Sequence, residues 1–476
     1  MSETRIPAPV TPSPARPSPV LGPAGLFTVL VGSALPMVDF FIVNVALPTI
    51  DHDLHAGPAL LEMVVGGYGV AYAVLLVLGG RLGDMIGRRR LFVWGTAAFG
   101  LTSVACGLAP DAWTLVAARV AQGAASALML PQVLATIQAT TEGARRGRAM
   151  SLYSATTGVA SAFGQVLGGV LLAADVWGTG WRSIFLVNAP VTLLALLLAR
   201  FVPETRSEHP QRVDGPGTVL LSLTLIALLV PLSEGRSAGW PLWAWVLLAV
   251  FPFAAVAFGR TEARAERAGR TPLVPPSLLR IHSVRSGLAV LVSFGLGWGG
   301  FMFIIAVVFQ EGLRLGPLDA GLAMIPLSVA FFTGSLVGPR LGARYGRRAV
   351  TAGALLQAAG IGGLALTFHW GWNSLGPWGT APALVLLGLG QGLLLPLTLR
   401  IVLSEVPVAQ AGVGGGVMVT TQQSFMALGV AVLGSLFLSL SASLGMRDAL
   451  MVTLGVHLVT VAANVVLSMR LPRALR

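Results

Sequence analysis

Two ionisable side chains of opposite charge, Asp39 and Arg119, lie well inside long apolar segments of the chain. At a rise of about 1.5 Å per helical residue, Asp39 lies roughly 14 Å and Arg119 roughly 9 Å from one end of its segment. A charged carboxylate costs a few kcal/mol in such surroundings, so Asp39 should face a cavity, find a partner or bind a proton. Asp39 is therefore a candidate proton carrier.

Arg119 is the natural partner of Asp39, because both residues would lie in the same half of a bilayer that these segments cross. An arginine keeps its charge, so Arg119 favours a charged Asp39 at short distance and a protonated one when the helices separate. A static ion pair that only holds two helices together is the alternative. Glu62, at the start of the second apolar segment, is either a secondary proton or cation site or an ordinary interfacial carboxylate.

The segments that carry these residues are long enough to cross a membrane as helices. Apolar residues make up 55% of the 476 positions and charged residues 11%, whereas soluble proteins carry roughly 25% charged residues. About 20 apolar residues in a helix span a bilayer. The sequence thus predicts an all-α integral membrane protein with fourteen spans, at approximately 24–48, 60–80, 91–108, 113–136, 149–174, 184–202, 215–233, 241–259, 286–310, 319–339, 349–369, 380–403, 411–440 and 449–469.

An internal repeat indicates that the chain consists of two homologous halves. GGRLGDMIGRR at 79–89 and GPRLGARYGRR at 338–348 share seven of eleven residues. Their period of 259 residues is far longer than a solenoid unit and is typical of duplicated secondary transporters. We expect a disordered cytoplasmic tail at 1–23, a six-helix bundle at 24–202, two inserted helices with a cytoplasmic linker at 203–284, and a second six-helix bundle with a short tail at 285–476.

The distribution of arginines predicts the orientation in the membrane. With both termini on the cytoplasmic side, 26 of the 31 arginines lie on inner segments, four in outer loops and one inside a span. Seven of the 11 tryptophans lie near predicted outer ends, as in an aromatic belt. We therefore expect a multi-pass protein of the inner (cytoplasmic) cell membrane. The long charged connection at 260–284 forms either a short surface helix or a solvated linker.

The composition excludes several kinds of chemistry. All 31 basic residues are arginine, so the chain has neither the lysine of a Walker A loop nor a Schiff-base lysine. The single cysteine, Cys106, cannot form a disulfide or a cysteine-based metal site within the chain. The net charge of +12 is spread over short gaps between apolar segments, which argues against a nucleic-acid partner. We expect no cofactor, no metal and no enzymatic activity, but a monomer that handles a small molecule and protons.

Asp84 stands among arginines at the junction of the second and third predicted helices. A carboxylate there can accept hydrogen bonds from a neighbouring helix N-terminus, while Arg88 and Arg89 can bind opposite helix ends or anionic lipid headgroups. Membrane topology alone would explain the arginines but not the aspartate. The second copy of the repeat has Ala343 in place of Asp84, so it should serve topology and packing more than gating.

Polar and aromatic side chains inside the spans are candidates for a binding cavity. Singly, each could be an interhelical hydrogen bond worth about 1 kcal/mol or less. Together they suit a cavity with an apolar wall and scattered polar groups, which is typical of sites for bulky amphipathic molecules. The candidates are Asn44, Tyr68, Tyr72, Gln122, Gln132, Thr156, Thr157, Gln165, Trp298, Gln310, Gln357, Gln391, Gln422 and Gln423.

Four motifs give the chain a resemblance to the major facilitator superfamily, and specifically to its fourteen-helix drug:proton antiporter branch. DFFIVNVALP at 39–48 resembles the first-helix motif of the branch, and GRLGDMIGRR at 80–89 matches the loop signature of the superfamily. RVAQG at 119–123 is similar to the fourth-helix motif, and WRSIFLVNAP at 181–190 resembles the stretch that leads into the sixth helix. The resemblance covers nearly the whole chain.

The resemblance implies a fold of two six-helix bundles and a cytoplasmic latch that stabilises the outward-open state and breaks during transport. The latch residues would be Gly80, Asp84, Gly87, Arg88 and Arg89. The fifth-helix antiporter motif is present in part, because Gly164, Gly168 and Gly169 are in place but Gln165 stands where the family has proline. The glycines favour close helix packing, and Gln165 leaves the family's backbone kink without its usual cause.

The sequence thus predicts a proton-driven exporter of hydrophobic or amphipathic drugs or antibiotics that works by alternating access. The thirteenth span offers Gln422 and Gln423 but no acid, which favours neutral or monocationic substrates over divalent cations. A dedicated exporter of one endogenous metabolite, such as a self-made antibiotic, a siderophore or a lipid, is the alternative. A polytopic membrane enzyme or sensor is a further alternative, which the absence of nucleophile and base spacing disfavours.

Overall fold

The computed structural model describes residues 20–206, 214–235, 238–270, 272–407 and 411–472. Most of the tail expected at 1–23 therefore lies outside the described residues. Within them, the chain forms helices and no strand.

The helices follow one another with short connections, as long apolar segments joined by turns require. Two π-helical turns, Val308–Gly312 and Val430–Gly434, continue α11 and α16. The α-helices are α1 Pro23–Leu54, α2 Gly57–Ile86, α3 Arg88–Gly107, α4 Ala112–Thr140, α5 Gly143–Ala174, α6 Ser183–Leu186, α7 Asn188–Leu198, α8 Gly215–Glu234, α9 Leu242–Arg267, α10 Pro276–Arg280, α11 His282–Val307, α12 Pro317–Leu322, α13 Ile325–Tyr345, α14 Arg347–Gly371, α15 Ala381–Leu403, α16 Ala411–Gly429, α17 Ser435–Leu444 and α18 Met446–Ser468.

Thirteen helical segments in the described part of the chain are long and apolar enough to cross a membrane. The segment that falls short of the expected fourteen is α3, a helix of 20 residues that begins with three arginines. Those charges shorten its apolar stretch. The expected spans otherwise coincide with helices, and α9 continues beyond its expected end to Arg267, so that part of the connection at 260–284 is helical.

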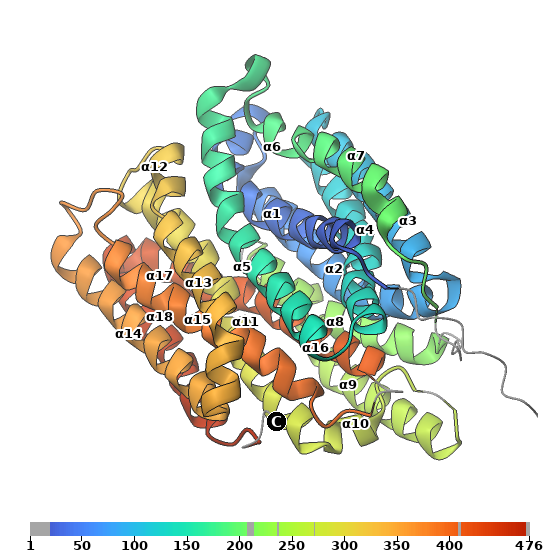
Figure 1. Cartoon of the computed structure of the whole chain (residues 1–476). Coiled ribbons are helices and arrows are strands. Elements are labelled where there is room, and N and C mark those ends of the chain that lie inside the picture. Colours follow the sequence, from blue (N-terminus) through green and yellow to red (C-terminus); the bar gives the residue numbers. More distant parts are fainter. Residues whose placement is uncertain (1–19, 207–213, 236–237, 271, 408–410, 473–476) are drawn as a thin grey trace, which may run out of the picture.

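The helices form two sets that lie side by side (Figure 1). In the first set α2 packs on α4, α1 on α5, and α3 on α4; in the second, α13 packs on α15, α14 on α15, and α11 on α16. The two sets meet where α5 packs against α12 and α13, and where α2 packs against α16. Helix α8 contacts α2 and α16, and α9 packs on α8, so the inserted pair lies outside both sets.

Each copy of the repeat ends a helix at a glycine with a positive φ angle. Gly87 (φ 115°) separates α2 from α3, and Gly346 (φ 56°) separates α13 from α14. Side chains rarely adopt such angles, whereas glycine does so without a steric penalty. The sharp turn therefore explains why both copies carry glycine at this position.

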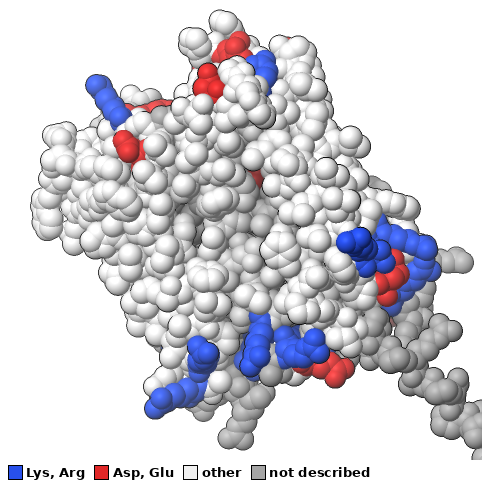
Figure 2. Space-filling model, turned by 45° about the horizontal axis from the view of Figure 1, so that its top comes forward, with Lys and Arg blue, Asp and Glu red and all other residues white. Residues whose placement is uncertain are grey.

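Glycines also permit the close approach of α1 and α5. A Cβ atom at Gly164 would lie 2.6 Å from the carbonyl oxygen of Val38, and one at Gly168 would lie 3.0 Å from Ile42 Cγ1. Gly169 is buried as well. Small residues let helix backbones come into van der Waals contact where lipid provides no hydrophobic drive. Most charged side chains visible in Figure 2 gather toward the two ends of the molecule, and the broad surface between them shows little charge.

Candidate functional site

Asp39 of α1 and Arg119 of α4 form an ion pair inside the first set of helices. Arg119 Nη1 donates a hydrogen bond to Asp39 Oδ2. Both side chains are fully buried, with 0% exposure. The partnership expected from their depth in the sequence is thus present, and it is shielded from solvent.

Two amide side chains complete the surroundings of Asp39. Gln122 Nε2 of α4 donates to Asp39 Oδ1 over 2.9 Å, and Asn188 Nδ2 of α7 donates to the same oxygen over 2.7 Å. Gln122 Oε1 in turn accepts from Arg119 Nη1 at 2.8 Å. A carboxylate that accepts several hydrogen bonds is stabilised in its charged form. Asp39 therefore joins α1, α4 and α7 through its charge.

The guanidinium of Arg119 is held by α2 as well. Its Nε donates to the carbonyl oxygen of Val64 over 3.1 Å, and its central carbon lies 4.3 Å from the centre of the Tyr68 ring. Cations over aromatic rings are attracted by the ring quadrupole. Arg119 Nη2 is buried and meets no hydrogen-bond partner among the described residues. One donor is thus available for a different arrangement of the same helices.

Further hydrogen bonds connect the cluster to Ser103 of α3. Asn188 donates to Ser103 Oγ over 2.9 Å, and Ser103 Oγ donates to the carbonyl oxygen of Phe185 over 2.9 Å. The Tyr68 hydroxyl lies 2.8 Å from Ser126 Oγ of α4. Neither Asn188 nor Ser103 was singled out as a site residue from the sequence. The sequence signal for Asn188 is its place in the stretch WRSIFLVNAP at 181–190.

Chemically, this cluster can link the protonation of Asp39 to a change in how the surrounding helices pack. Removing one partner of a buried ion pair is strongly unfavourable, because it leaves an uncompensated charge away from water. Protonation of Asp39 would neutralise the acceptor on which Arg119, Gln122 and Asn188 converge. The contacts that join α1 to α4 and α7 would then weaken together.

A small cavity lies where the two helix sets meet. It is lined from six helices, α1, α5, α11, α13, α15 and α16, and its volume is about 30 Å³. That space holds about two water molecules, whereas sites for drug-sized molecules measure roughly 300–1,000 Å³. The structure therefore shows this centre in a closed form. The lining residues are Met37, Tyr153, Thr157, Gly158, Phe294, Trp298, Phe331, Leu395, Leu399, Gln422, Gln423 and Met426.

Four of the twelve residues that line the central cavity are aromatic. The ring of Trp298 stacks at 6.3 Å on Phe294 and at 6.3 Å on Phe301, and it lies 6.2 Å from Phe331. Gln422 and Gln423 are the polar groups on α16. Trp298 lies 259 residues after Asp39, which is the period of the repeat, and α11 begins 259 residues after α1. The second half thus has a cavity-lining tryptophan at the position of the aspartate.

The remaining predicted cavity residues lie elsewhere. Tyr68 and Gln122 belong to the ion-pair cluster, and Tyr72 is buried beside Tyr68, with ring centres 6.1 Å apart. Asn44 is buried in α1. Gln165 donates to the carbonyl oxygen of Met302 at 3.3 Å, so it bridges the two helix sets. Gln310 bonds to its own helix at 3.4 Å, through the Ala306 carbonyl.

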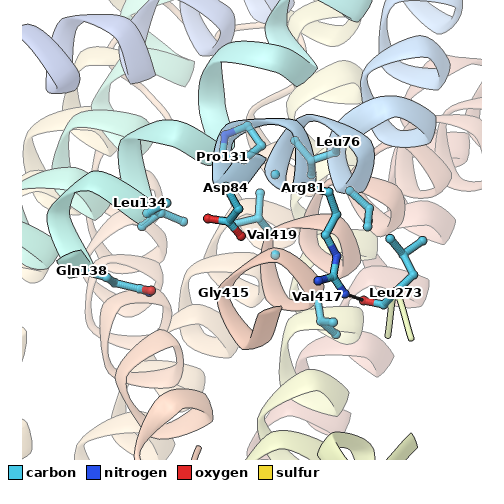
Figure 3. A pocket seen from close by; sticks show the side chains of 14 residues that line it. Leu76, Arg81, Asp84, Pro131, Leu134, Gln138, Leu273, Gly415, Val417 and Val419 are labelled. Carbon is cyan, nitrogen blue, oxygen red and sulfur yellow. Dashed lines mark hydrogen bonds between the residues drawn. The ribbon is translucent and has the colours of Figure 1, made fainter. Parts of the chain in front are cut away.

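Part of the loop signature lines a second cavity, of about 50 Å³, between α2, α4 and α16 (Figure 3). Asp84 and Gly80 line it, together with Gly415 and Val417 of α16. Arg88 Nη2 donates to Asp84 Oδ1 over 2.9 Å within the turn at Gly87. Arg89 is half-buried on α3. Asp84 thus lies at the contact between the two helix sets.

Glu62 has a carboxylate neighbour that the sequence did not suggest. Glu234 ends α8, just beyond its apolar stretch Gly215–Leu232. Burial, and to a lesser extent the negative charge of Glu62, raises the pKa of Glu234 to about 8. Glu234 is therefore mostly neutral at physiological pH, at the end of the molecule opposite the loop signature.

Comparison with known proteins relates these features to transporters. The chain matches the model of the Major Facilitator Superfamily over residues 29–430. It is 36% identical over 422 residues to a probable actinorhodin transporter of Streptomyces coelicolor, covering 88% of this chain and 73% of the relative. It is 36% identical over 419 residues to a puromycin resistance protein of Streptomyces alboniger, covering 86% of this chain and 81% of the relative.

Two further matches support the same family. The multidrug resistance protein Stp of Mycobacterium tuberculosis is 32% identical over 427 residues, which cover 87% of this chain and 76% of Stp. The crystal structure of the human organic anion transporter MFSD10 has a TM-score of 0.65 at 16% identity and covers 93% of this chain and 99% of that one, so the fold is shared. With its many spanning helices, the chain is a multi-pass membrane protein and belongs to the Major Facilitator Superfamily.

Proposed function

We propose that this protein is a proton-coupled secondary transporter that exports hydrophobic or amphipathic drugs or antibiotics by alternating access. Relatives that cover most of the chain are named as exporters or resistance proteins for different antibiotics. The proton gradient is an adequate energy source, because each charge that crosses the membrane supplies about 2.3 kcal/mol per 100 mV. Asp39 is the proton carrier, and Arg119 modulates it.

The arrangement of α1 supports this proposal most strongly. Asp39 of α1 is enclosed by donors from α4 and α7, while Met37 of the same helix lines the central cavity. A proton taken up by Asp39 would release α1 from α4 and α7 and so move one wall of the cavity. Substrate binding and proton binding would then favour different positions of α1, as antiport requires.

The test is Asp39→Asn in liposomes that contain the purified protein. The amide keeps the shape of the side chain but cannot carry a proton, so flux driven by a pH gradient should fall to background while dye binding persists. Asp111→Asn is the matched control, because Asp111 is an exposed carboxylate that caps α4. Gradient-driven flux that survives Asp39→Asn would refute proton coupling at this residue.

A dedicated exporter of one endogenous metabolite is the second candidate. Relatives named for single compounds, actinorhodin and tetracenomycin C, favour it, whereas the aromatic wall of the cavity suits several bulky molecules. Efflux of several unrelated dyes from cells that express the chain would support broad drug export. Efflux of a single compound would support the dedicated exporter.

We also infer the arrangement in the membrane. Helix α3 also spans the membrane and brings the number of spans to fourteen. Its 20 residues are about 30 Å long, which matches the bilayer core. Both termini face the cytoplasm, the protein is a monomer of the inner membrane, and the two bundles comprise residues 24–202 and 285–476. Labelling of single cysteines from either side of the membrane tests this topology, beginning with the turns at Gly87 and Leu108.

The loop signature serves as the inner gate. Asp84 is held by Arg88 at the contact between α2 and α16, so separating those helices would expose the pair to water. Glu62 is a secondary proton or cation site at the outer end, where its negative charge favours the protonated form of Glu234. Asp84→Asn should slow export without altering dye binding, because Asp84 lies away from the central cavity.

A further inference from the structure

Residues 272–281, here called the strap, connect the inserted helix α9 to α11, the first helix of the second set. The strap contains the short helix α10 and lies at the arginine-rich end of the molecule, below α8 and α9 in Figure 1. Its side chains Leu273 and Leu278 are buried, with 2% and 0% exposure. The strap is thus packed against the protein and does not run freely through solvent.

The start of the strap is fastened to the first helix set by Arg81 of α2. Arg81 Nη2 donates to the carbonyl oxygens of Pro272 at 2.5 Å and Leu273 at 3.1 Å, and Arg81 is only 8% exposed (Figure 3). Arg81 belongs to the loop signature but had no role in the latch expected from the sequence. Its guanidinium binds two backbone carbonyls of the strap.

The inserted helices hold the same part of the strap from the other side. Glu262 of α9 is 1% exposed, and its Oε2 accepts a hydrogen bond from the backbone N–H of Val274 over 2.6 Å. One turn further along α9, Glu266 accepts from the backbone N–H of Ser277 at 3.3 Å. Three consecutive residues of the strap, 272–274, are therefore held by a buried arginine and a buried glutamate.

The chain that follows the strap is fastened to the second helix set. The backbone N–H of Ser283, at the start of α11, donates to Glu405 Oε2 over 3.0 Å, and Ser283 Oγ donates to the carbonyl oxygen of Val402 over 3.2 Å. Val402 lies in the last turn of α15, and Glu405 follows two residues after the helix ends. The strap consequently begins on one helix set and ends on the other.

The strap also occupies the seam that must open. Leu273 lines the same cavity as Asp84 of α2 and Gly415, Gly416 and Val417 of α16 (Figure 3). Alternating access requires α2 and α16 to separate at this end. Fully extended, ten residues would reach roughly 33 Å, so the length of the strap does not prevent this separation. Any restraint must come from the contacts of the strap, among which Arg81 and Glu262 supply those of buried charged side chains.

We propose that the strap is a lock on the inner gate. Arg81 keeps it attached to α2 and Glu262 keeps it attached to α9 while α2 and α16 are together, and these contacts must be released before the inner end opens. Opening would leave the buried side chains of Arg81 and Glu262 without their backbone hydrogen-bond partners, which is unfavourable. The inserted pair α8 and α9 thereby gains a role, because it positions Glu262. The lock rests on the alternating access of the proposed function, but not on its substrate or its proton.

The first test measures access to the seam. In a Cys106→Ser background, Gln138→Cys places one thiol in the cavity that Leu273 lines. Inside-out vesicles are treated with a membrane-impermeant maleimide. Arg81→Ala and Glu262→Ala should each raise the labelling rate about tenfold, because the inner end opens more often. Arg264→Ala is the matched control, an exposed arginine on α9 two residues from Glu262, and should leave the rate unchanged.

The second test measures attachment of the strap by hydrogen exchange of its backbone amides in the purified full chain. Arg81→Ala and Glu262→Ala should each speed exchange within residues 272–281 about tenfold, and Arg264→Ala should not. Faster exchange with unchanged thiol labelling would overturn the lock, because the strap would then be released without opening the gate. Unchanged exchange would overturn it as well, because the two side chains would not hold the strap.

Two further variants keep the proposal testable if an alanine variant does not fold. Arg81→Lys retains the positive charge but loses the planar guanidinium that reaches two carbonyls, and Val274→Pro removes the N–H that Glu262 accepts. Each variant should raise the rates of thiol labelling and of amide hydrogen exchange. Neither measurement needs a drug or a pH gradient. Failure of the lock is therefore distinct from failure of proton-coupled export, which only the flux of Asp39→Asn would show.

Discussion

Met37 and Asp39 lie two residues apart on α1 and contact different parts of the protein. Met37 lines the central cavity between the two helix sets, whereas Asp39 is enclosed within the first set by donors from α4 and α7. Successive positions on a helix are turned by about 100°, so residues two apart point to different faces. A shift of α1 would therefore be felt at the cavity and at the carboxylate together.

The ion pair predicts a characteristic pattern of stabilities. Arg119→Met should lower the free energy of unfolding at neutral pH by about 3–5 kcal/mol, because it leaves a buried carboxylate unpaired. Asp39→Asn together with Arg119→Met should recover much of that loss, since neither charge remains. Thermal unfolding of the detergent-solubilised variants measures both effects. Equal losses in the single and double variants would show that the pair itself contributes little.

The aromatic wall of the cavity predicts a loss of substrate affinity. Trp298→Ala should weaken the binding of an aromatic dye about tenfold, or about 1.4 kcal/mol, because Trp298 is the ring on which Phe294 and Phe301 stack beside the cavity. Fluorescence titration of purified protein provides the measurement. Trp370→Ala is the control, since Trp370 is 77% exposed on the surface and should not affect binding.

The contact of α1 with α5 predicts that Gly164 tolerates no side chain. Gly164→Ala should destabilise the protein by about 1–3 kcal/mol and slow transport, because its Cβ would lie 2.6 Å from the carbonyl oxygen of Val38 and force the helices apart. Gly147→Ala, on the same helix, meets no atom within 4 Å and should be tolerated. Melting temperature and dye efflux are compared for the two variants. A tolerated Gly164→Ala would mean that α1 and α5 can separate freely.

Glu234 predicts a pH-dependent loss of stability. Its pKa is raised from 4.5 to about 8, so between these values the folded state holds a proton that the unfolded state has lost. Stability from this group therefore falls as pH rises from about 4.5 to 8 and then stays constant. Glu234→Gln should flatten the melting temperature over that range and be relatively more stable than the native chain at pH 8. Glu311→Gln, an exposed carboxylate, should leave the pH profile unchanged.

The sequence by itself determined the class of the protein, because the signals concerned are local. Long apolar segments, arginine clusters and the repeat at Gly79 and Gly338 specify spanning helices and duplicated halves wherever those segments lie in space. Asp39 and Arg119 could be paired in advance, since a charge inside an apolar helix needs a partner and few partners are available at that depth. The glycines of α5 were likewise readable, because their absent side chains mark close packing.

Only the tertiary structure decided which polar groups share one site. Tyr68 and Gln122 were expected in the cavity but surround the ion pair, because the rotation of α2 and α4 about their axes decides which face meets which neighbour. Asn188 and Arg81 act through partners more than 100 residues away in the chain, Asp39 and the strap. Such contacts depend on how distant helices pack, and a linear pattern of polar residues carries no information about that packing.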